Sequence, residues 1–312
     1  MDAQPLFRCL LDEQPTEFVA GRLAVKPGSP QVVRRLILNP DCWFSRNGPV
    51  RVPFLERFSQ EPETIWILDP ATDALLPFWL GSDFSQWLDN LHPGGSLANL
   101  PLEVLSTLCS AQVLVTENHK TERRQQWAKT AAKSKALFHQ NGFVSLEGLL
   151  HPFHVAALRR YYRDLIAAGG LSLGDSQCAD RYGCHNETVA RFFHHQLTAA
   201  IGEVAGEPVQ PSYVYLASYV NEAELEKHTD REQCEFSVSL CLDFQPEPPD
   251  TSPWPLYLET KLGAVAVHQR IGDGVLYRGR TLPHYRTRLP KGCTSTSIFF
   301  HYVRRDFAGP LD

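Results

Sequence analysis

Three side chains in the last third of the sequence have the types and the spacing that suit one metal ion. His228 and Asp230 are two positions apart, and His284 follows more than fifty residues later. Alternate side chains of an extended segment project from the same face, so an imidazole and a carboxylate at this spacing can reach one ion together. Two imidazoles and one carboxylate leave the other positions of an octahedral ion open. These residues therefore predict a metal centre that can carry out chemistry.

The sequence around His284 sharpens this prediction. A Gly-Asp turn at 272–273 leads into the apolar run 274–277, and Gly279 then precedes the histidine. One carboxylate and two histidines on one face of the ion form the preferred site of non-haem Fe(II) oxygenases. An alternative stays open, in which these polar residues lie on unrelated loops and His284 is a core histidine with satisfied hydrogen bonds.

The same stretch resembles the Fe(II)/2-oxoglutarate-dependent oxygenases, in particular their prolyl hydroxylase and phytanoyl-CoA hydroxylase branches. In that family a tyrosine stands nine positions before the first ligand, as Tyr219 does before His228, and the second histidine follows a Gly-Asp-x-x-x-aromatic run, as His284 does. The resemblance covers residues 134 to 304. It implies Fe(II) held by His228, Asp230 and His284, with 2-oxoglutarate as cosubstrate and O2 as oxidant. The implied reaction hydroxylates an unactivated C–H bond of a small molecule or a peptide-bound residue and releases succinate and CO2.

The cation that should pair with the cosubstrate carboxylate departs from the family pattern. Family members carry an Arg on the last strand, but here Ser295 stands near that place, in a run of Cys, Thr and Ser without any base. A buried charge left unpaired costs about 3–5 kcal/mol. Strand alternation nominates Arg286, which is two residues after the second histidine, and Arg280 is the next choice. Hydroxyls of Tyr219 and Ser295 can add hydrogen bonds. If no cation reaches the site, an oxygenase with another reductant remains open.

Strands that would position these residues dominate the chain after Pro211. The apolar runs are separated by Pro- and Gly-rich turns at the spacing of a β-sandwich or barrel. We predict strands at 212–220, 236–244, 255–259, 263–268, 274–277, 284–289 and 294–303. The family resemblance implies that they form a double-stranded β-helix, or jelly roll. The loop 245–253, rich in Pro and acidic residues, is a candidate rim for the mouth of the site.

Helices are predicted to brace the outside of this sheet. One begins near Thr121 and ends at Asn141-Gly142, where glycine provides the left-handed stop of a helix. A second begins at Pro152, because proline is favoured in the first turn. A third has Asn186 as its cap and an apolar stripe that includes Val189 and Phe193.

Residues 1–120 are predicted to form a separate accessory α+β domain, and residues 121–312 the jelly-roll domain. The first part reads as a hairpin at 64–76, a short helix capped by Ser82 or Asp83, a second helix from Pro101 and a strand at 112–115. This order resembles the small winged-helix modules that bind leader peptides in ribosomal-peptide-modifying enzymes. The alternative is an accessory unit that forms a homodimer or covers the catalytic domain.

Composition excludes several classes of protein. A chain of 312 residues with 43% hydrophobic and 21% charged residues is typical of a globular protein, and its formal net charge of -5 provides no basic field for nucleic acid. There is no apolar run of about 18 residues for a membrane span and no signal-peptide pattern at the start. The cysteines are scattered without a C-x-x-C pair, which favours reduced thiols and a cytoplasmic location.

The sequence thus predicts an α+β protein with a mainly β core. The predicted function is a non-haem Fe(II)/2-oxoglutarate-dependent dioxygenase that acts on a small-molecule or peptide substrate. The alternative is a non-catalytic jelly roll that binds a ligand or a peptide without turnover.

Overall fold

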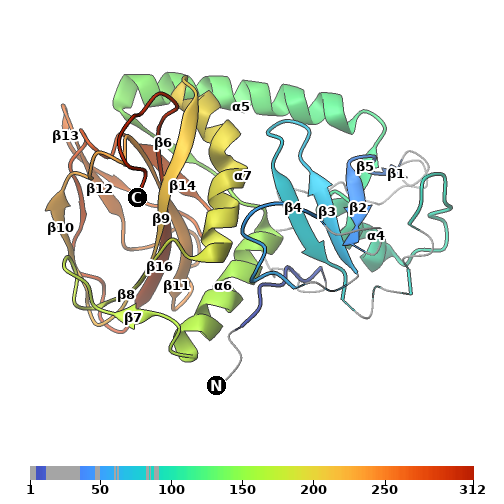
Figure 1. Cartoon of the computed structure of the whole chain (residues 1–312), viewed down its shortest axis with the longest axis horizontal. Helices are drawn as coiled ribbons and strands as arrows, with labels where there is room; N and C mark the ends of the chain where they lie inside the picture. Colours follow the sequence, from blue (N-terminus) through green and yellow to red (C-terminus); the bar gives the residue numbers. More distant parts are fainter. Residues whose placement is uncertain are drawn as a thin grey trace.

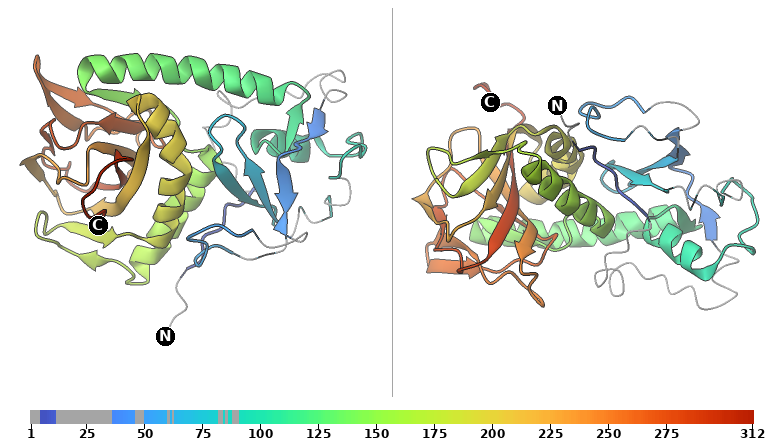
Figure 2. Two further views of the ribbon diagram at one scale, coloured as in Figure 1. Left: turned by 45° about the horizontal axis from the view of Figure 1, so that its top comes forward. Right: turned by 90° about the horizontal axis from the view of Figure 1, so that it is seen from below.

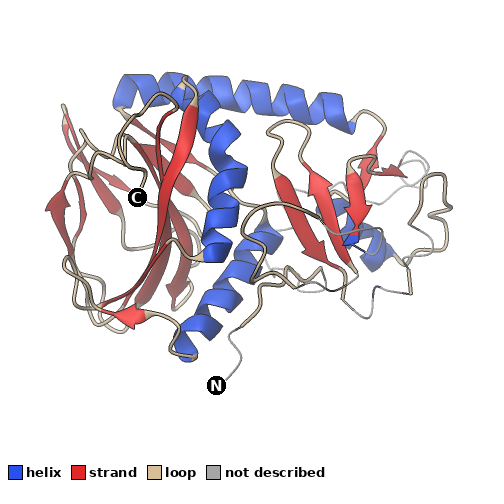
Figure 3. Ribbon diagram, viewed as in Figure 1, coloured by secondary structure: helices blue, strands red, loops and turns tan. Residues whose placement is uncertain are grey.

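The computed structural model describes residues 5–11, 36–45, 50–59, 61, 63–81, 84, 86–87 and 91–312. The chain forms an N-terminal lobe and a strand-rich C-terminal lobe, and one long helix runs along both (Figure 1). Helices and sheets are both present, and the larger lobe is built mainly from strands (Figure 3). The mixed, sheet-rich character predicted from the sequence is confirmed.

The described part of the N-terminal lobe contains a small antiparallel sheet, a further strand pair and helix α4. Its sheet has the order β2-β3-β4, a second pair joins β1 to β5, and α4 packs beside them. The bounds are β1 Leu36–Leu38, β2 Cys42–Phe44, β3 Thr64–Leu68, β4 Leu75–Trp79, α4 Leu102–Ser110 and β5 Leu114–Thr116. The predicted hairpin is the β3–β4 pair, and the helix predicted from Pro101 is α4. The predicted caps Ser82 and Asp83 lie outside the described residues.

Helix α5 (His119–Asn141) connects the two lobes. It ends at Gly142, whose φ of 79° is the left-handed conformation that the Asn-Gly pair predicts. Near its start, Arg123 donates two hydrogen bonds to the carboxylate of Asp69 in the β3–β4 turn. Farther along, Trp127 donates to Glu203 on α7. The helix is therefore anchored in both lobes.

Two further helices lie between the large sheet and the N-terminal lobe (Figures 1 and 2). They are α6 (Pro152–Ala167) and α7 (Thr188–Ala205). One continuous cluster of buried side chains includes Phe78 from the N-terminal lobe together with Phe153 and Phe193 from these helices. The lobes therefore share a hydrophobic core. The side chain that caps α7 is that of Glu187, which accepts from the backbone N–H of Ala190, so the prediction of Asn186 as the cap was wrong by one residue.

The C-terminal lobe contains two antiparallel sheets. The larger has the order β6-β14-β11-β16-β9-β8-β7, and the smaller has the order β10-β15-β12-β13. The strands of the larger sheet are β6 Phe143–Leu146, β7 Ser172–Leu173, β8 Arg181–His185, β9 Val209–Tyr219, β11 Phe236–Gln245, β14 Gly274–Tyr277 and β16 Thr294–Arg304. Those of the smaller sheet are β10 Leu225–His228, β12 Leu256–Thr260, β13 Gly263–Val267 and β15 His284–Arg286. Strands β7, β8 and β10 were not predicted.

The two sheets pack against each other through apolar side chains. Leu256, Leu258 and Val267 from the smaller sheet form one buried cluster with Val275 and Tyr277 from β14 of the larger sheet. Strands β10 and β15 are neighbours, with His228 and His284 paired in the register. This pairing brings two distant parts of the sequence to one edge of the interior. Within the described part of the chain, no helix has both the length and the apolar character needed to cross a bilayer.

Candidate metal centre

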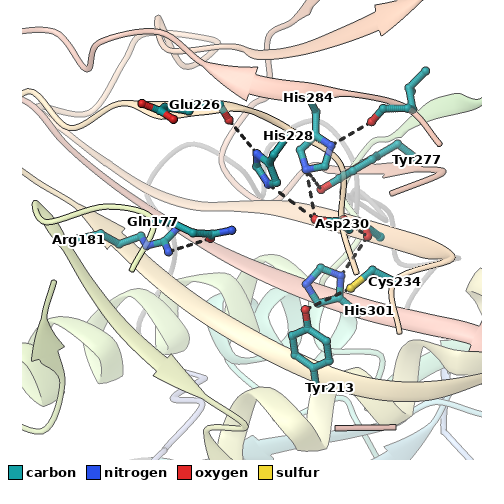
Figure 4. Close-up of polar contacts among 12 residues, drawn as sticks. Gln177, Arg181, Tyr213, Glu226, His228, Asp230, Cys234, Tyr277, His284 and His301 are labelled. Carbon is teal, nitrogen blue, oxygen red and sulfur yellow. Dashed lines mark hydrogen bonds and ion pairs between the residues drawn. The ribbon is translucent and has the colours of Figure 1, made fainter. Parts of the chain in front are cut away.

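The structure brings His228, Asp230 and His284 together between the two sheets (Figure 4). The two imidazole rings are 4.4 Å apart between centroids. Their Nε2 atoms lie 3.7 Å (His228) and 3.4 Å (His284) from the same oxygen, Oδ1 of Asp230. The three ligand atoms are all within 4.8 Å of one another. Two nitrogens and one carboxylate oxygen thus face a common point, as one ion requires.

Backbone carbonyls fix both imidazoles in the form that binds metal. Nδ1 of His228 is 2.8 Å from the carbonyl oxygen of Glu226, and Nδ1 of His284 is 3.0 Å from that of Leu282. Because a carbonyl only accepts, each Nδ1 carries the proton and each Nε2 keeps its lone pair. Burial, and then the neighbouring His284, lower the pKa of His228, which favours the neutral ligand form.

Asp230 is oriented by contacts on its other oxygen and on its backbone. Ser237 Oγ donates to Asp230 Oδ2 at 2.7 Å, and Nδ1 of His301 lies 3.0 Å from the same Oγ. Because the serine proton goes to the carboxylate, the imidazole donates to the serine. Burial alone would raise the pKa of Asp230, but the neighbouring imidazoles of His284 and His301 and the hydrogen bond from Ser237 hold it well below its usual range. Oδ1 is thereby left free to face both histidines.

Gly279 leaves room for this carboxylate. A Cβ at this position would lie 2.3 Å from Asp230 Oδ2 and 2.4 Å from Ser237 Oγ. The carbonyl of the same glycine accepts a 2.9 Å hydrogen bond from the backbone N–H of Asp230. The glycine that the sequence places before the second histidine is therefore required for space at the site.

A fully buried phenol also reaches the centre. The hydroxyl of Tyr277, on β14, lies 3.4 Å from Nε2 of His284. Burial, and then the charge of Asp230, raise the pKa of Tyr277 well above its ordinary value. The group is a protonated hydrogen-bond donor next to a candidate metal ligand. The sequence analysis did not single it out, although the aromatic position of the Gly-Asp-x-x-x-aromatic run marks it.

The metal residues lie on the wall of a cavity of about 370 Å³. Four tyrosines and Phe299 supply much of the remaining wall, and Arg181 and Asp175 lie on it as well. Arg181 is 4% exposed. Its Nε donates to Asp175 Oδ2 at 2.8 Å, and its Nη1 lies 3.3 Å from the hydroxyl of Tyr219. This ion pair between β8 and the turn before it was missed, because the run 181–185 has no apolar alternation that would mark a strand.

Arg286 is the second buried guanidinium, and its surroundings differ. It is 3% exposed and lies next to Tyr219 and Tyr277, behind the cavity wall. Nη1 donates to the carbonyl of Trp254 at 2.6 Å, and the guanidinium carbon lies 4.8 Å from the centre of that indole. No carboxylate among the described residues pairs with it, and its Nε has no hydrogen-bond partner. Burial lowers the pKa of Arg286.

The remaining residues nominated from the sequence are divided between the interior and the surface. Tyr219 lines the cavity, and Ser295 is buried opposite it in the β9–β16 register. Arg280 is not brought to the site: it is exposed and lies 3.4 Å from Glu235. Strand β15 begins at His284, so the alternation that placed Arg286 inside does not extend back across the turn to Arg280.

The predicted rim loop 245–253 does not line the cavity. Arg159 on α6 forms an ion pair with Glu247 in the loop and with Asp243 just before it. Arg163, also on α6, pairs with Asp243. These ion pairs hold the loop against the helix rather than over the metal residues.

No protein-family model and no curated protein matches the sequence. Among solved structures, the chain is similar to SnoN, a non-haem alpha-ketoglutarate-dependent epimerase from nogalamycin biosynthesis (16% identity over 57% of this chain and 83% of that one, TM-score 0.48). It is also similar to a Pseudomonas putida prolyl-4-hydroxylase (18% identity over 56% of this chain and 99% of that one, TM-score 0.46). A third similar structure is a Trichoplax adhaerens prolyl hydroxylase in complex with a peptide fragment of hypoxia inducible factor (11% identity over 59% of this chain and 93% of that one, TM-score 0.49). Likenesses at this level do not place the chain in a family.

Proposed function

We propose that the chain is an Fe(II)/2-oxoglutarate-dependent dioxygenase. The observation that carries this proposal is the convergence of the Nε2 atoms of His228 and His284 on Oδ1 of Asp230. Both imidazoles have the tautomer that leaves Nε2 free, and the carboxylate is held with one oxygen directed at them. Two nitrogens and one oxygen on one face suit Fe(II) and leave positions for other ligands.

The strand order supports a jelly roll around this site. Strands β14, β11, β16 and β9 are consecutive in one sheet, and β10, β15, β12 and β13 make up the other. Apart from the β12–β13 hairpin, each of these eight strands is followed in the chain by one from the opposite sheet. This is the arrangement expected of two antiparallel sheets in a double-stranded β-helix. In this arrangement the proposed metal ligands His228, the last residue of β10, and His284, the first residue of β15, face the interior.

The cosubstrate fits two unsatisfied polar groups of the interior. Arg286 is a buried cation without a carboxylate partner, and its Nε is unpaired. Ser297 Oγ is also buried without a partner, on the face of β16 that carries Phe299 of the cavity wall. The distal carboxylate of 2-oxoglutarate would provide acceptors for both groups. We assign Arg286 as the cation that binds it, with Tyr219 and Ser295 nearby.

Bound Fe(II) would supply the site at which 2-oxoglutarate chelates and O2 is activated for C–H hydroxylation. The protein holds the metal through His228, Asp230 and His284. Ser237 keeps the carboxylate oriented, and the buried tyrosine walls exclude water. A cavity of about 370 Å³ suits a small molecule or the side chain of a peptide-bound residue beside the cosubstrate.

Turnover of 2-oxoglutarate tests the proposal. Protein incubated with Fe(II), ascorbate and O2 is expected to convert 2-oxoglutarate to succinate and CO2. The activity should be lost in His228→Ala and on chelation of the metal. Tyr302→Phe is a control for unspecific damage to the large sheet, because Tyr302 does not line the cavity and its hydroxyl donates to the carbonyl of His194. Wild-type protein that binds Fe(II) yet never consumes 2-oxoglutarate, with or without candidate substrates, would favour the non-catalytic binding protein instead.

The division of the chain at residue 120 is part of the proposal. The N-terminal lobe would be an accessory unit whose sheet covers α6 and α7, since one cluster of buried side chains spans these elements. A peptide substrate or a second copy of the chain as its partner stays a prediction. Because the lobes share a core, binding of candidate peptides should be measured with the whole chain rather than with residues 1–120 alone.

A further inference from the structure

The phenol of Tyr277 has a single hydrogen-bond partner, and that partner is a metal-binding atom. Its side chain crosses from β14 in the large sheet to β15 in the small sheet, where its ring lies 4.7 Å from the ring of His284. The hydroxyl donates to Nε2 of His284 at 3.4 Å, because Nδ1 of that histidine carries the proton. No other hydrogen bond of this hydroxyl is present among the described residues.

Metal binding must change this contact. The lone pair of His284 Nε2 is the one that would coordinate the ion, so this atom can then no longer accept a hydrogen bond from Tyr277. A buried hydroxyl left without an acceptor costs about 1–3 kcal/mol. No hydrogen bond from Tyr277 to Asp230 is present among the described residues, where Oδ1 faces the two histidines and Oδ2 accepts from Ser237. The phenol therefore needs a new acceptor close to the ion.

We propose that Tyr277 donates a hydrogen bond to the metal-bound carboxylate of the chelated 2-oxo acid. This inference rests on the proposed function. It assigns the two ends of the cosubstrate to different side chains: Tyr277 positions the 2-oxo acid end at the metal, and Arg286 binds the distal carboxylate. Tyr277 is a positioning residue that acts only when metal and cosubstrate are both bound.

Two ligands separate these roles in Tyr277→Phe, which removes one oxygen atom from a fully buried ring. Anaerobic titrations of the Fe(II)-loaded protein should use 2-oxoglutarate and pyruvate, which has the 2-oxo acid end and no distal carboxylate. We expect the variant to bind both ligands about tenfold more weakly, as loss of a hydrogen bond to a charged group predicts. Arg286→Met should weaken 2-oxoglutarate far more than pyruvate. Fe(II) alone should bind Tyr277→Phe about fivefold or more tightly than wild type, because the variant has no hydroxyl that metal binding leaves without an acceptor.

A spectroscopic readout and a control complete the experiment. The visible charge-transfer absorption of the Fe(II)·2-oxo acid chelate should shift in Tyr277→Phe, because a hydrogen bond to the coordinating carboxylate changes its donor strength. Tyr302→Phe is the matched control: it removes an equally buried hydroxyl that donates to the carbonyl of His194 at 2.9 Å, away from the cavity. Its affinities and absorption should equal those of wild type.

The outcomes distinguish the inference from the proposed function. Wild-type protein that binds Fe(II) but neither 2-oxo acid contradicts both. Wild-type binding of 2-oxoglutarate with equal affinity and absorption in Tyr277→Phe overturns the role of Tyr277 and leaves the dioxygenase proposal standing. A variant that instead loses affinity for Fe(II) alone would show that the phenol orients His284, which also overturns the proposal.

Discussion

Two buried guanidinium groups lie on either side of Tyr219, and they have opposite surroundings. Arg181, on the cavity wall, forms an ion pair with Asp175 and contacts the hydroxyl of Tyr219. Arg286 lies behind the wall, in a buried region that also contains Trp254 and Ser297 and that we call the niche. It has the carbonyl of Trp254 as its nearest partner and no carboxylate among the described residues. The same side chain at nearly the same burial is thus neutralised in one region and left charged in the other.

The difference teaches which of the two is part of the wall and which is a binding group. A buried ion pair with good geometry is satisfied within the protein and holds the β7–β8 hairpin in place. A buried cation without a counter-charge is destabilising by itself, and a fold retains one where an anion joins it. We therefore propose Arg286 for the anion site and a structural role for Arg181.

Arg286→Met should have the largest effect, because it removes the guanidinium group in the niche. Loss of the only cation for the distal carboxylate is expected to weaken 2-oxoglutarate binding by about 3–5 kcal/mol, roughly a hundredfold or more. The free energy of unfolding without ligands should stay equal or rise, since relief of the buried charge offsets the lost hydrogen bonds to Trp254, Ser239 and Gln269. Titration calorimetry and chemical denaturation measure the two. A variant that unfolds more easily and binds 2-oxoglutarate normally would make Arg286 structural.

Asp175→Asn tests the other half of the comparison, the ion pair of Arg181 on the cavity wall. The amide keeps the size of the side chain but removes the counter-charge of Arg181, which then resembles Arg286. We expect the free energy of unfolding to fall by about 2–3 kcal/mol, below the range for a fully buried pair because the Asp175 side chain is 26% exposed. Affinity for 2-oxoglutarate should change little at temperatures at which the variant stays folded. A stable variant with lost cosubstrate binding would exchange the roles of the two arginines.

Strand alternation correctly placed the side chain of Arg286 inside the protein, whereas Arg280, the second choice, is exposed. Residues two apart share a face only while the backbone stays extended, and β15 runs from His284 to Arg286. Arg280 lies before this strand, beyond the turn, so its direction could not be read from the position of the histidine. That His228, Asp230 and His284 lie together was predictable from their residue types, the two-residue spacing of the first pair and the Gly-Asp run before His284.

Arg181 could not be predicted because its strand has no apolar pattern. Strand β8 is next to the last strand of its sheet, and most of its side chains are only half buried. Its register against β9, which sets Arg181 opposite Tyr219, is a long-range pairing. The loop 245–253 was misplaced for a related reason, since ion pairs from Arg159 to Asp243 and Glu247 set its position. Contacts between distant segments leave no local signal in the sequence.

Gly279→Ala changes the metal residues without altering either guanidinium. The added Cβ would meet Asp230 Oδ2 and Ser237 Oγ at less than van der Waals distance and push the carboxylate away from the histidines. We expect the affinity for Fe(II) to fall by about 10- to 100-fold, as for loss of other groups that orient a ligand. Metal titration measures this. Gly292→Ala, at a site where a Cβ meets no atom within 4 Å, is a glycine control, although its φ of 76° adds some strain there. Unchanged Fe(II) affinity in Gly279→Ala would mean that Asp230 is not a ligand.

Ser297→Ala gives the smallest effect and sharpens the comparison within the niche. Ser297 Oγ is buried without a partner among the described residues, and Ser297 pairs in register with Cys241, whose thiol lies near Arg286. Removing an unsatisfied hydroxyl should not lower the stability of the ligand-free protein, because no hydrogen bond is lost. If this hydroxyl donates to the distal carboxylate, 2-oxoglutarate should bind about three- to tenfold more weakly, the effect of one hydrogen bond of about 1 kcal/mol. Pyruvate should bind as in wild type, because it has no group that reaches the niche. Equal weakening of both ligands would place Ser297 at the metal end instead and leave Arg286 as the sole group bound to the far carboxylate.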